Sequence, residues 1–281
     1  MKIKTLILIL ITIVVTTQFY ACEEVPPNIN MDPPVIPDTT KELVSNRVLI
    51  EDFSGVQCVN CPKSAEKLDD LMAQYPGRIV GVLIHPDNIF TKPYEGDSSL
   101  VADEANDLES MIGTPQGYPV GVVNRRIFPG ETETLLNYEK WAGYLSLELK
   151  DTADVKVRIS TSWNSTSRKV DVTVTLIYNV DDTREQFLTV ELTESKIIAS
   201  QLTPTGVDPN YENNHILRQM FTSYTGESIK TSFTKGDSIV KTYSMTLKDW
   251  WDENNCNVVA LVHLGGDSLN VINVNEEELV D

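Results

Sequence analysis

Two cysteines separated by two residues are the feature of this sequence best suited to chemistry. Cys58 and Cys61 stand directly before a helical pattern, and Pro62 suits the first turn of that helix. A helix N-terminus offers unpaired N–H groups and partial positive charge, which stabilise a thiolate and lower the pKa of a cysteine. We therefore expect Cys58 to act as a nucleophile and Cys61, one turn further on, to resolve a mixed disulfide.

Three other uses of the pair stay open. The cysteines could be half of a zinc site, although no second Cys-x-x-Cys or His pair lies nearby in the sequence. They could form a purely structural disulfide, although so short a loop constrains the unfolded chain weakly. They could also belong to an inherited redox fold that no longer turns over. In the redox interpretation, Val59 and Asn60 tune the potential and contact the substrate.

Strand and helix patterns alternate between residues 44 and 150, and they predict an α/β domain that positions the cysteines. Three short apolar runs indicate buried strands: 48–53, 78–84 and 118–123. Three amphipathic patterns indicate helices: 62–75, 100–112 and 135–145. Elements in this order favour a three-layer arrangement with helices on a central sheet.

The periodicity changes to two over residues 151–281. Apolar and polar residues alternate, or form short apolar runs, in six segments: 155–159, 170–176, 188–192, 239–245, 258–263 and 271–274. Such strands, with turn signals every ten or so residues, predict an all-β, immunoglobulin-like antiparallel sandwich. This half contains no recognisable catalytic set.

Residues 1–21 have the pattern of a lipoprotein signal peptide. Lys2 and Lys4 precede an apolar core at 6–15, which is too short to cross a bilayer as a helix. The following Phe19-Tyr20-Ala21-Cys22 resembles a bacterial lipoprotein box. This resemblance implies that Cys22 is acylated and becomes the first residue of the mature chain. An uncleaved membrane anchor is the alternative.

Residues 22–43 are predicted to be a tether between the lipid and the first folded domain. Glu23 and Glu24 resemble the surface-export signal of Bacteroidetes lipoproteins, and two solvated glutamates are the alternative. Prolines between residues 26 and 37 favour an extended, semi-rigid chain. We expect attachment to the outer membrane through the lipid on Cys22, with the cell surface favoured over the periplasmic face.

The composition excludes several classes of protein. Hydrophobic residues make up 41% and charged residues 23% of the 281 positions, which excludes a disordered chain, a collagen-like fibre and a multi-span membrane protein. The net charge of −18 would repel phosphates, so no nucleic-acid partner is expected. With four cysteines the chain is not a disulfide-stapled miniprotein. We expect no organic cofactor and no metal.

The order of strand, Cys-x-x-Cys and helix resembles the thioredoxin fold. Asp52 lies six residues before Cys58 at the end of a predicted strand. The resemblance implies a buried acid that relays a proton to or from Cys61, and desolvation would raise its pKa toward the working pH. A strand-end hydrogen bond to the following turn is the alternative use of Asp52. Glu51 points to the opposite face and is the weaker candidate.

The segment Gly117-Tyr118-Pro119 resembles the cis-proline element of the same fold. The resemblance implies that Pro119 faces the disulfide and shapes a groove. It also implies that the backbone of Tyr118 pairs with a bound peptide in strand-addition recognition. An ordinary trans proline at the start of a strand is the alternative.

The sequence departs from the thioredoxin pattern in three places. Gln57 stands where thioredoxins usually carry Trp, and the dipeptide between the cysteines is Val-Asn rather than Gly-Pro. The segment from Cys58 to Pro119 is also longer than in the minimal fold, and residues 85–110 look like an insertion. These departures leave the redox direction and the partner open.

Beyond the cysteines, the sequence from the lipoprotein box to its end resembles an outer-membrane lipoprotein family of Bacteroidetes, named after a protein of roughly 28 kDa. The residues that carry this resemblance are Cys58–Cys61, the segment 117–125 and, most specifically, the segment 211–218. That family is thioredoxin-like in its first half and has no settled activity. The resemblance therefore implies architecture and location rather than a substrate.

Five further residues whose side chains could do chemistry have simple structural interpretations. His215 and Arg218, in the segment 211–218, favour a structural turn over a ligand site. His85 and His263 lie on apolar strands and are expected to be satisfied core histidines. Cys256 leads into an apolar strand, so we expect a buried, inert thiol rather than a cross-domain redox partner.

Two hypotheses for function follow. The first is a thiol–disulfide oxidoreductase of the cell envelope, acting on exported or surface proteins that carry thiols or disulfides, with Cys58, Cys61, Asp52 and Pro119 as its site. The second is a surface adhesion or binding lipoprotein in which the disulfide is only a brace. A reactive, low pKa of Cys58 favours the first, and a near-normal pKa with a strongly negative potential favours the second.

Overall fold

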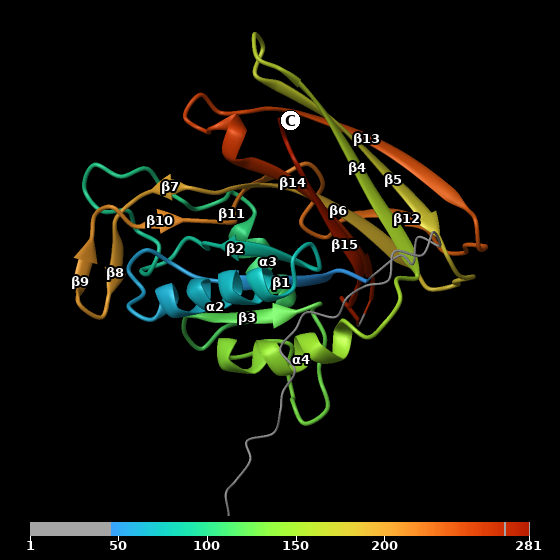
Figure 1. Cartoon of the computed structure of the whole chain (residues 1–281), viewed down its shortest axis with the longest axis horizontal. Coiled ribbons are helices and arrows are strands. Elements are labelled where there is room, and N and C mark those ends of the chain that lie inside the picture. Colours follow the sequence, from blue (N-terminus) through green and yellow to red (C-terminus); the bar gives the residue numbers. More distant parts are fainter. Residues whose placement is uncertain (1–45, 267, 281) are drawn as a thin grey trace, which may run out of the picture. The chain divides into compact units, whose positions relative to one another are not determined.

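The computed structural model of the chain, drawn in Figure 1, describes residues 46–266 and 268–280. The predicted signal peptide, the acylated Cys22, the Glu23-Glu24 pair and the tether lie outside the described residues. Within the described residues, no helix has the length and apolar character needed to span a membrane.

The helices and strands alternate in the first part of the chain, and strands dominate the rest. Along the chain they are β1 (Val48–Phe53), α2 (Cys61–Gln74), β2 (Ile79–Ile84), α3 (Ala105–Ile112), β3 (Val120–Val123), the 3-10 turn η2 (Tyr138–Lys140), α4 (Trp141–Glu148), β4 (Val155–Asn164), β5 (Lys169–Tyr178), β6 (Gln186–Glu194), β7 (Ile197–Ile198), β8 (Gln201–Thr203), β9 (Gly206–Asp208), β10 (Glu212–Asn213), β11 (Ile216–Met220), β12 (Glu227–Lys230), β13 (Ser238–Thr246), η3 (Glu253–Asn255), β14 (Cys256–Leu264) and β15 (Val271–Glu278).

One eight-stranded mixed sheet connects the two halves of the sequence. Its strands run in the order β15-β14-β6-β11-β2-β1-β3, and β12 pairs with β6 away from this path. The pairs β1–β2 and β2–β11 are parallel, whereas the other pairs are antiparallel. Every residue of β1 and β2 is buried, as expected of parallel strands covered on both faces.

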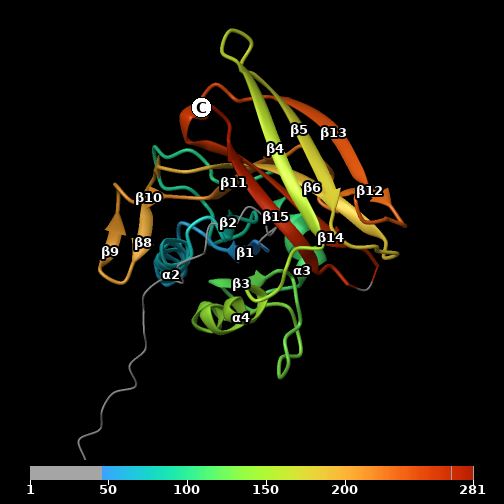
Figure 2. The same ribbon diagram turned by 45° about the vertical axis from the view of Figure 1, so that its right-hand side comes forward.

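Helices cover both faces of the sheet around β1. Leu68 of α2 and Trp141 of α4 pack in one apolar cluster with Ile50. Leu108 of α3 packs in a second cluster with Leu49, on the opposite face. A Cβ on Gly81 of β2 would lie 2.7 Å from a Leu68 methyl carbon, so glycine permits the close approach of α2 to the sheet. This arrangement confirms the predicted α/β layering, and Figures 1 and 2 show it from two sides.

A separate three-stranded antiparallel sheet, in the order β13-β5-β4, lies over the β6–β14 end of the large sheet. Its inward residues, such as Val172 and Val174, share one apolar cluster with Val190 of β6 and Val258 and Ala260 of β14. The six period-two segments are therefore all strands, as predicted.

The immunoglobulin-like sandwich predicted for residues 151–281 is not evident. The strands β6, β14 and β15 continue the mixed sheet of the first half, through the pairing of β11 with both β6 and β2. Alternation shows which face of a strand is buried but carries no information about which strand lies beside it. The domain boundary at 150/151 stays a prediction.

Two predicted helices have different limits. The helix predicted over 100–112 begins only at Ala105, although Leu100 and Ala102 are buried without it. The closing helix predicted from residue 135 begins with the 3-10 turn η2 and continues as α4. The predicted buried positions are buried or half-buried in both places, whereas periodicity alone does not define where a helix begins.

Candidate functional site

The cysteine pair lies where β1 passes into α2. Cys58 and Cys61 form a disulfide, with their Cα atoms 5.4 Å apart. Cys61 is the first residue of α2, and Pro62 follows it in the first turn, as predicted. The backbone N–H of Cys58 donates to the carbonyl of Gly55, and that of Cys61 donates to the carbonyl of Cys58. The loop is therefore held by its own turns.

The start of α2 presents an electropositive end to the disulfide. Its first turn reads Cys-Pro-Lys-Ser, and the N-cap residue Asn60 makes no capping hydrogen bond with its side chain. The N–H groups of Cys61 and Lys63 already donate to carbonyls of the preceding turn, so the helix end favours a thiolate through its partial positive charge. Asn60 and Val59 are exposed beside the disulfide, with Val59 40% exposed. A substrate role for these two residues stays a prediction.

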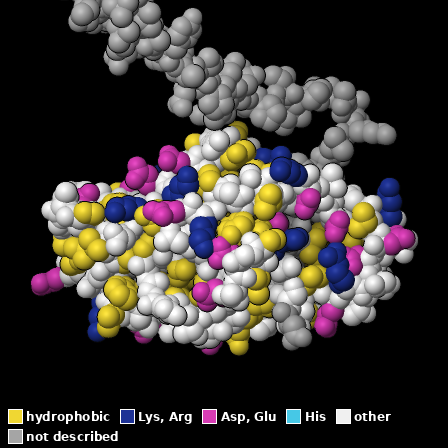
Figure 3. Space-filling model, turned by 90° about the horizontal axis from the view of Figure 1, so that it is seen from below, with side chains coloured by type: hydrophobic (Ala, Val, Ile, Leu, Met, Phe, Trp, Pro, Cys, Tyr) yellow, Lys and Arg dark blue, Asp and Glu magenta, His cyan; other side chains and the backbone are white. Residues whose placement is uncertain are grey.

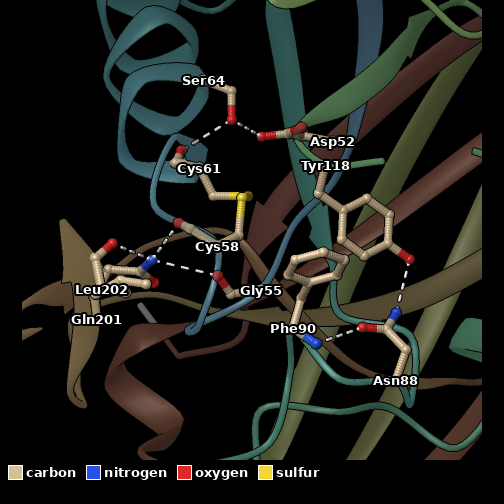
Figure 4. Close-up of a disulfide and its surroundings, with 10 residues drawn as sticks. All are labelled: Asp52, Gly55, Cys58, Cys61, Ser64, Asn88, Phe90, Tyr118, Gln201 and Leu202. Atoms are coloured by element: carbon tan, nitrogen blue, oxygen red, sulfur yellow. Dashed lines mark hydrogen bonds between the residues drawn. A yellow bond between two sulfur atoms is a disulfide. The ribbon is translucent and has the colours of Figure 1, made fainter. Parts of the chain in front are cut away.

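Asp52 lies on the α2 face of β1 and is fully buried. The hydroxyl of Ser64, on α2, lies 2.6 Å from Asp52 Oδ2 and 2.9 Å from the carbonyl oxygen of Cys61 (Figure 4). The other carboxyl oxygen of Asp52 has no hydrogen-bond partner among the described residues. Burial raises the pKa of Asp52 to about 8, against the lowering effect of the Ser64 hydrogen bond. The rise in pKa agrees with the sequence-based expectation.

The Tyr118–Pro119 peptide bond is cis, which confirms that sequence-based prediction. The Tyr118 hydroxyl donates to a carboxylate oxygen of Glu109 and accepts a hydrogen bond of 2.9 Å from the Asn88 amide. The Tyr118 ring meets the Phe90 ring edge-on, with 5.5 Å between centroids. Tyr118 is thus fixed by its side chain (Figure 4), while its backbone pairing with a peptide stays a prediction.

The segment that the sequence marked as an insertion packs against the disulfide loop. A Cβ on Gly55 would lie 2.5 Å from the carbonyl oxygen of Phe90, so this approach requires glycine. The same carbonyl accepts a hydrogen bond of 2.7 Å from the N–H of Gln57. Gln57, which stands where thioredoxins usually carry Trp, also donates from its side chain to the carbonyl of Lys92.

A second segment, which comes from the C-terminal half of the chain, covers the cysteines. We call residues 197–213 the arm; it contains the paired strands β7 and β10 and the hairpin β8–β9. The Gln201 amide lies 3.1 Å from the Cys58 carbonyl oxygen and 3.3 Å from that of Gly55, and Leu202 N–H donates to the Val56 carbonyl. Under this cover Cys58 and Cys61 are 3% and 2% exposed.

The segment 211–218 forms one wall of a small pocket beside Cys61. Tyr211 and His215 line this pocket together with Asp69 of α2 and His85 at the end of β2. The carbonyl of His215 accepts a hydrogen bond of 2.7 Å from Leu83, and its imidazole lies 3.5 Å from the Asp69 carboxylate. His215 has a positive φ of 59°, which agrees with the predicted turn.

The other residues that the sequence singled out lie away from the disulfide. Arg218 is buried and forms an ion pair of 3.0 Å with Glu194. Cys256 is a buried free cysteine whose pKa is raised by burial, which agrees with an inert thiol.

The two remaining histidines are buried, and burial lowers the pKa of both: to about 4 for His85 and about 3 for His263. His263 contacts Thr189 and the carbonyl of Leu264, as a satisfied core histidine should. His85 differs from the prediction, because its Nδ1 atom lacks a partner within the part of the chain that is described.

Glu51 faces away from the disulfide, as predicted, and forms an ion pair in the core. The Arg125 guanidinium donates to both of its carboxylate oxygens, at 2.6 and 2.7 Å, and both side chains are fully buried. Glu191 of β6 is also fully buried, and both of its carboxyl oxygens lack a partner among the described residues. Burial, together with the nearby charge of Glu51, raises the pKa of Glu191 to about 8.

Sequence reasoning missed Ser64 and Gln201. Ser64 lies three residues after Cys61, so a helical projection places the two on one face, and this signal was available. Gln201 lies 143 residues from Cys58, and no local sequence pattern predicts that the two residues are in contact. Within residues 46–266 and 268–280, no group of three or more His, Cys, Asp or Glu side chains is placed to hold a metal ion.

Comparison with known proteins gives a family match and several similar folds. The family model described as outer membrane protein Omp28 matches residues 105–280. HBP35 of Porphyromonas gingivalis has a similar structure, with a TM-score of 0.66 and 18% identity, over 84% of this chain and 76% of that one. Protein AGR_C_4864 from Agrobacterium tumefaciens gives a TM-score of 0.52 and 14% identity, over 84% and 96%.

These two similarities establish a shared fold and nothing about activity. A domain of the outer membrane lipoprotein Omp28 from Porphyromonas gingivalis aligns with 45% of this chain and 88% of that one, with 16% identity and a TM-score of 0.31. No curated protein matches the sequence.

Proposed function

The chain belongs to the Omp28 outer membrane protein family, and from this premise we propose that its Cys58–Cys61 disulfide exchanges with thiols of exported proteins. The observation that carries the proposal is the buried carboxyl group of Asp52, which is linked to the first turn of α2 through Ser64. A structural disulfide needs no acid of this kind beneath it, and burying one is costly. A thioredoxin-like role for residues 44–150 is part of the proposal.

The exchange consists of two successive displacements at sulfur. A thiolate of the partner attacks Sγ of Cys58, the Cys58–Cys61 bond breaks, and Cys61 leaves with the bonding electron pair. Asp52, protonated below its pKa of about 8, gives its proton to the Cys61 sulfur. A second thiol of the partner then attacks the mixed disulfide, so the partner is oxidised and Cys58 and Cys61 are reduced. The reverse sequence reduces a partner disulfide, with ionised Asp52 accepting the proton.

Access to the sulfurs requires the arm to move, since Cys58 and Cys61 are almost fully covered. The arm is held to the disulfide loop by the hydrogen bonds of Gln201 and Leu202, and Ser200 N–H also donates to Asp97. Exposure of the sulfurs therefore requires a local opening in which these bonds break. Once the arm lifts, the exposed Val59 and Asn60 and the Tyr118–Pro119 segment border the sulfurs. On the face drawn in Figure 3, acidic and basic side chains are interspersed among apolar and uncharged ones.

The direct test is catalysed refolding of a scrambled disulfide protein, and catalysed reduction of insulin, by the full mature chain. Cys58→Ser should abolish both activities, because the attacked sulfur is gone. Cys256→Ser is the matched control, since its thiol is buried away from the site, and it should retain full activity. Equal rates for the wild type and Cys58→Ser would refute the proposal.

One observation favours a second candidate, in which the disulfide is a brace in a binding or adhesion lipoprotein. Both cysteines are covered, and the arm that covers them is itself hydrogen-bonded to the loop. In that case the reduced protein should show a near-normal Cys58 pKa in an iodoacetamide titration. A Cys58 pKa well below about 7 instead indicates a stabilised thiolate and favours exchange.

We also propose that the acylated Cys22 anchors the chain in the outer membrane, at the cell surface. Family membership supports the outer membrane, and the lipid supplies the affinity for the bilayer. Cys22→Ser should release the chain from the membrane fraction. Protease added to intact cells should remove the folded part of the wild type if it faces outward, and should leave it intact if it faces the periplasm.

A further inference from the structure

The Ser64 side chain contacts both the buried acid and the first turn of the cysteine helix. Its hydroxyl lies 2.6 Å from Asp52 Oδ2 and 2.9 Å from the Cys61 carbonyl oxygen, and the residue is fully buried. The second oxygen of Asp52, Oδ1, has no partner among the described residues. The two oxygens of this carboxyl group therefore stand in different surroundings.

A hydroxyl group carries a single hydrogen, so Ser64 can donate to only one of its two neighbours at a time. When Asp52 is ionised, the hydrogen bond to the charged carboxylate is the stronger one, and Ser64 donates to Oδ2. When Asp52 is neutral with its proton on Oδ1, Oδ2 is an uncharged acceptor, and the hydrogen bond from Ser64 to it is weaker. Ser64 can therefore hold Oδ2 in both protonation states, and its hydrogen bond favours the ionised one.

We propose that Ser64 is a positioning residue, which holds Oδ2 of Asp52 in both protonation states and leaves Oδ1 free to exchange a proton with the Cys61 sulfur. This inference rests on the proposed function and deepens it, because it assigns separate tasks to the two carboxyl oxygens. Ser64 itself gains and loses no proton overall. The proton that moves is the one released or taken up by Cys61 as the disulfide opens or closes.

The surroundings of Asp52 make Ser64 the main polar influence on it. From α2, the contact is Ser64 itself; from the arm, the phenol of Tyr211 lies close enough for a negative charge on Asp52 to raise the Tyr211 pKa. His85, at the end of β2, lines the pocket beside Cys61 and is held neutral by burial. The neighbouring strand β3 contributes Val and Gly residues only. Burial raises the pKa of Asp52, and the Ser64 hydrogen bond is the opposing influence.

The test is a pH titration of the Asp52 carboxyl carbon by NMR in the oxidised full-length mature chain, with Asp52→Asn to identify the signal. Ser64→Ala should raise the midpoint by about one pH unit, since the lost hydrogen bond favours the ionised form. Ser64→Thr keeps a hydroxyl and should restore the midpoint. The matched control is Ser110→Ala, which removes an exposed helical serine bonded only to a backbone carbonyl and should change nothing.

Exchange kinetics give the second measurement. In the direction that needs ionised Asp52, Ser64→Ala should be slowed about tenfold at pH 7, with the pH profile displaced upward by the same amount. An unchanged midpoint and an unchanged profile would overturn the proposal. If the wild type performs no exchange but Ser64→Ala still moves the midpoint, the proposed function fails while the positioning of Asp52 by Ser64 stands.

Discussion

Two neighbouring acids on β1 are buried to the same extent but have different hydrogen-bond partners. Glu51 faces the α3 side of the sheet, where Arg125 donates two hydrogen bonds to it. Asp52 faces α2, where its described partner is the neutral hydroxyl of Ser64. Glu51 is a structural ion pair, whereas Asp52 is an acid whose charge is left uncompensated. The comparison teaches that burial alone does not decide the state of a carboxyl group; the partner that the fold provides does.

The region around Glu51 also contains Glu191, a buried acid without a hydrogen-bond partner among the described residues, so the contrast is not simply one of faces. Arg125 lies among the charges of Glu51 and Glu191, and only the first forms hydrogen bonds with it. Glu191 lies on β6 of the C-terminal half, whereas Glu51 lies on β1. This buried cluster therefore connects the two halves of the sequence, while the opposite face of β1 carries the site of the proposed disulfide exchange.

The largest effect is expected from breaking the ion pair. Arg125→Met leaves Glu51 buried without a cation and should lower the free energy of unfolding by about 3–5 kcal/mol. Urea denaturation at pH 7 measures this. The double variant Glu51→Gln/Arg125→Met removes both charges and should recover most of the loss. A double variant no more stable than Arg125→Met would show that the arginine acts through packing and not through charge.

Asp52, which lacks a charged partner, should make the stability of the fold depend on pH. Because the pKa of Asp52 is about 8 in the folded chain against an ordinary 3.8, the folded state keeps a proton that the unfolded state loses. This contribution to stability is complete below pH 4 and is lost as the pH rises toward 8. Asp52→Asn should therefore match the wild type near pH 4 and exceed it by ~1–3 kcal/mol at pH 9. Denaturant titrations of the oxidised protein at both pH values test the sign, and a variant destabilised at pH 9 would contradict it.

Replacing Glu191 should change stability in the same direction as replacing Asp52, but by less. Its pKa is also about 8, raised from 4.5, so its contribution to stability is lost between pH 4.5 and 8. Arg125 offsets part of the burial cost, so Glu191→Gln should gain only ~1 kcal/mol at pH 9. Thermal unfolding at pH 5 and pH 9 measures the change. Exchange activity should stay unchanged, in contrast to Asp52→Asn, which should slow exchange about 100-fold.

The smallest effect is expected where the arm meets the disulfide loop. Gln201→Ala removes the amide that contacts the carbonyls of Gly55 and Cys58, and a lost hydrogen bond of about 1 kcal/mol should speed reduction by dithiothreitol 2- to 10-fold. Gln57→Ala is the matched control, because that glutamine bonds on the insertion side of the same loop and leaves the arm in place. Equal reduction rates in both variants would indicate that the arm does not limit access.

Much of the site could be read from short stretches of sequence. The start of a helix is predicted by Cys58, Cys61 and Pro62, and α2 begins at Cys61. The apolar run 48–53 placed Asp52 on a buried strand, and the peptide bond before Pro119 is cis. Each of these features depends on residues within one element or one turn, where periodicity and local geometry are strong signals.

The sequence by itself determined the chemistry and the local elements of this protein: two cysteines before a helix, an acid on a buried strand, and strands throughout the second half. Only the tertiary structure decided what surrounds that chemistry. Gln201 reaches Cys58 across 143 residues, and β11 joins β6 to β2. The physical reason is that strand pairing and side-chain cover are chosen by the summed packing of distant segments, whereas each segment's own pattern specifies only which of its faces is buried.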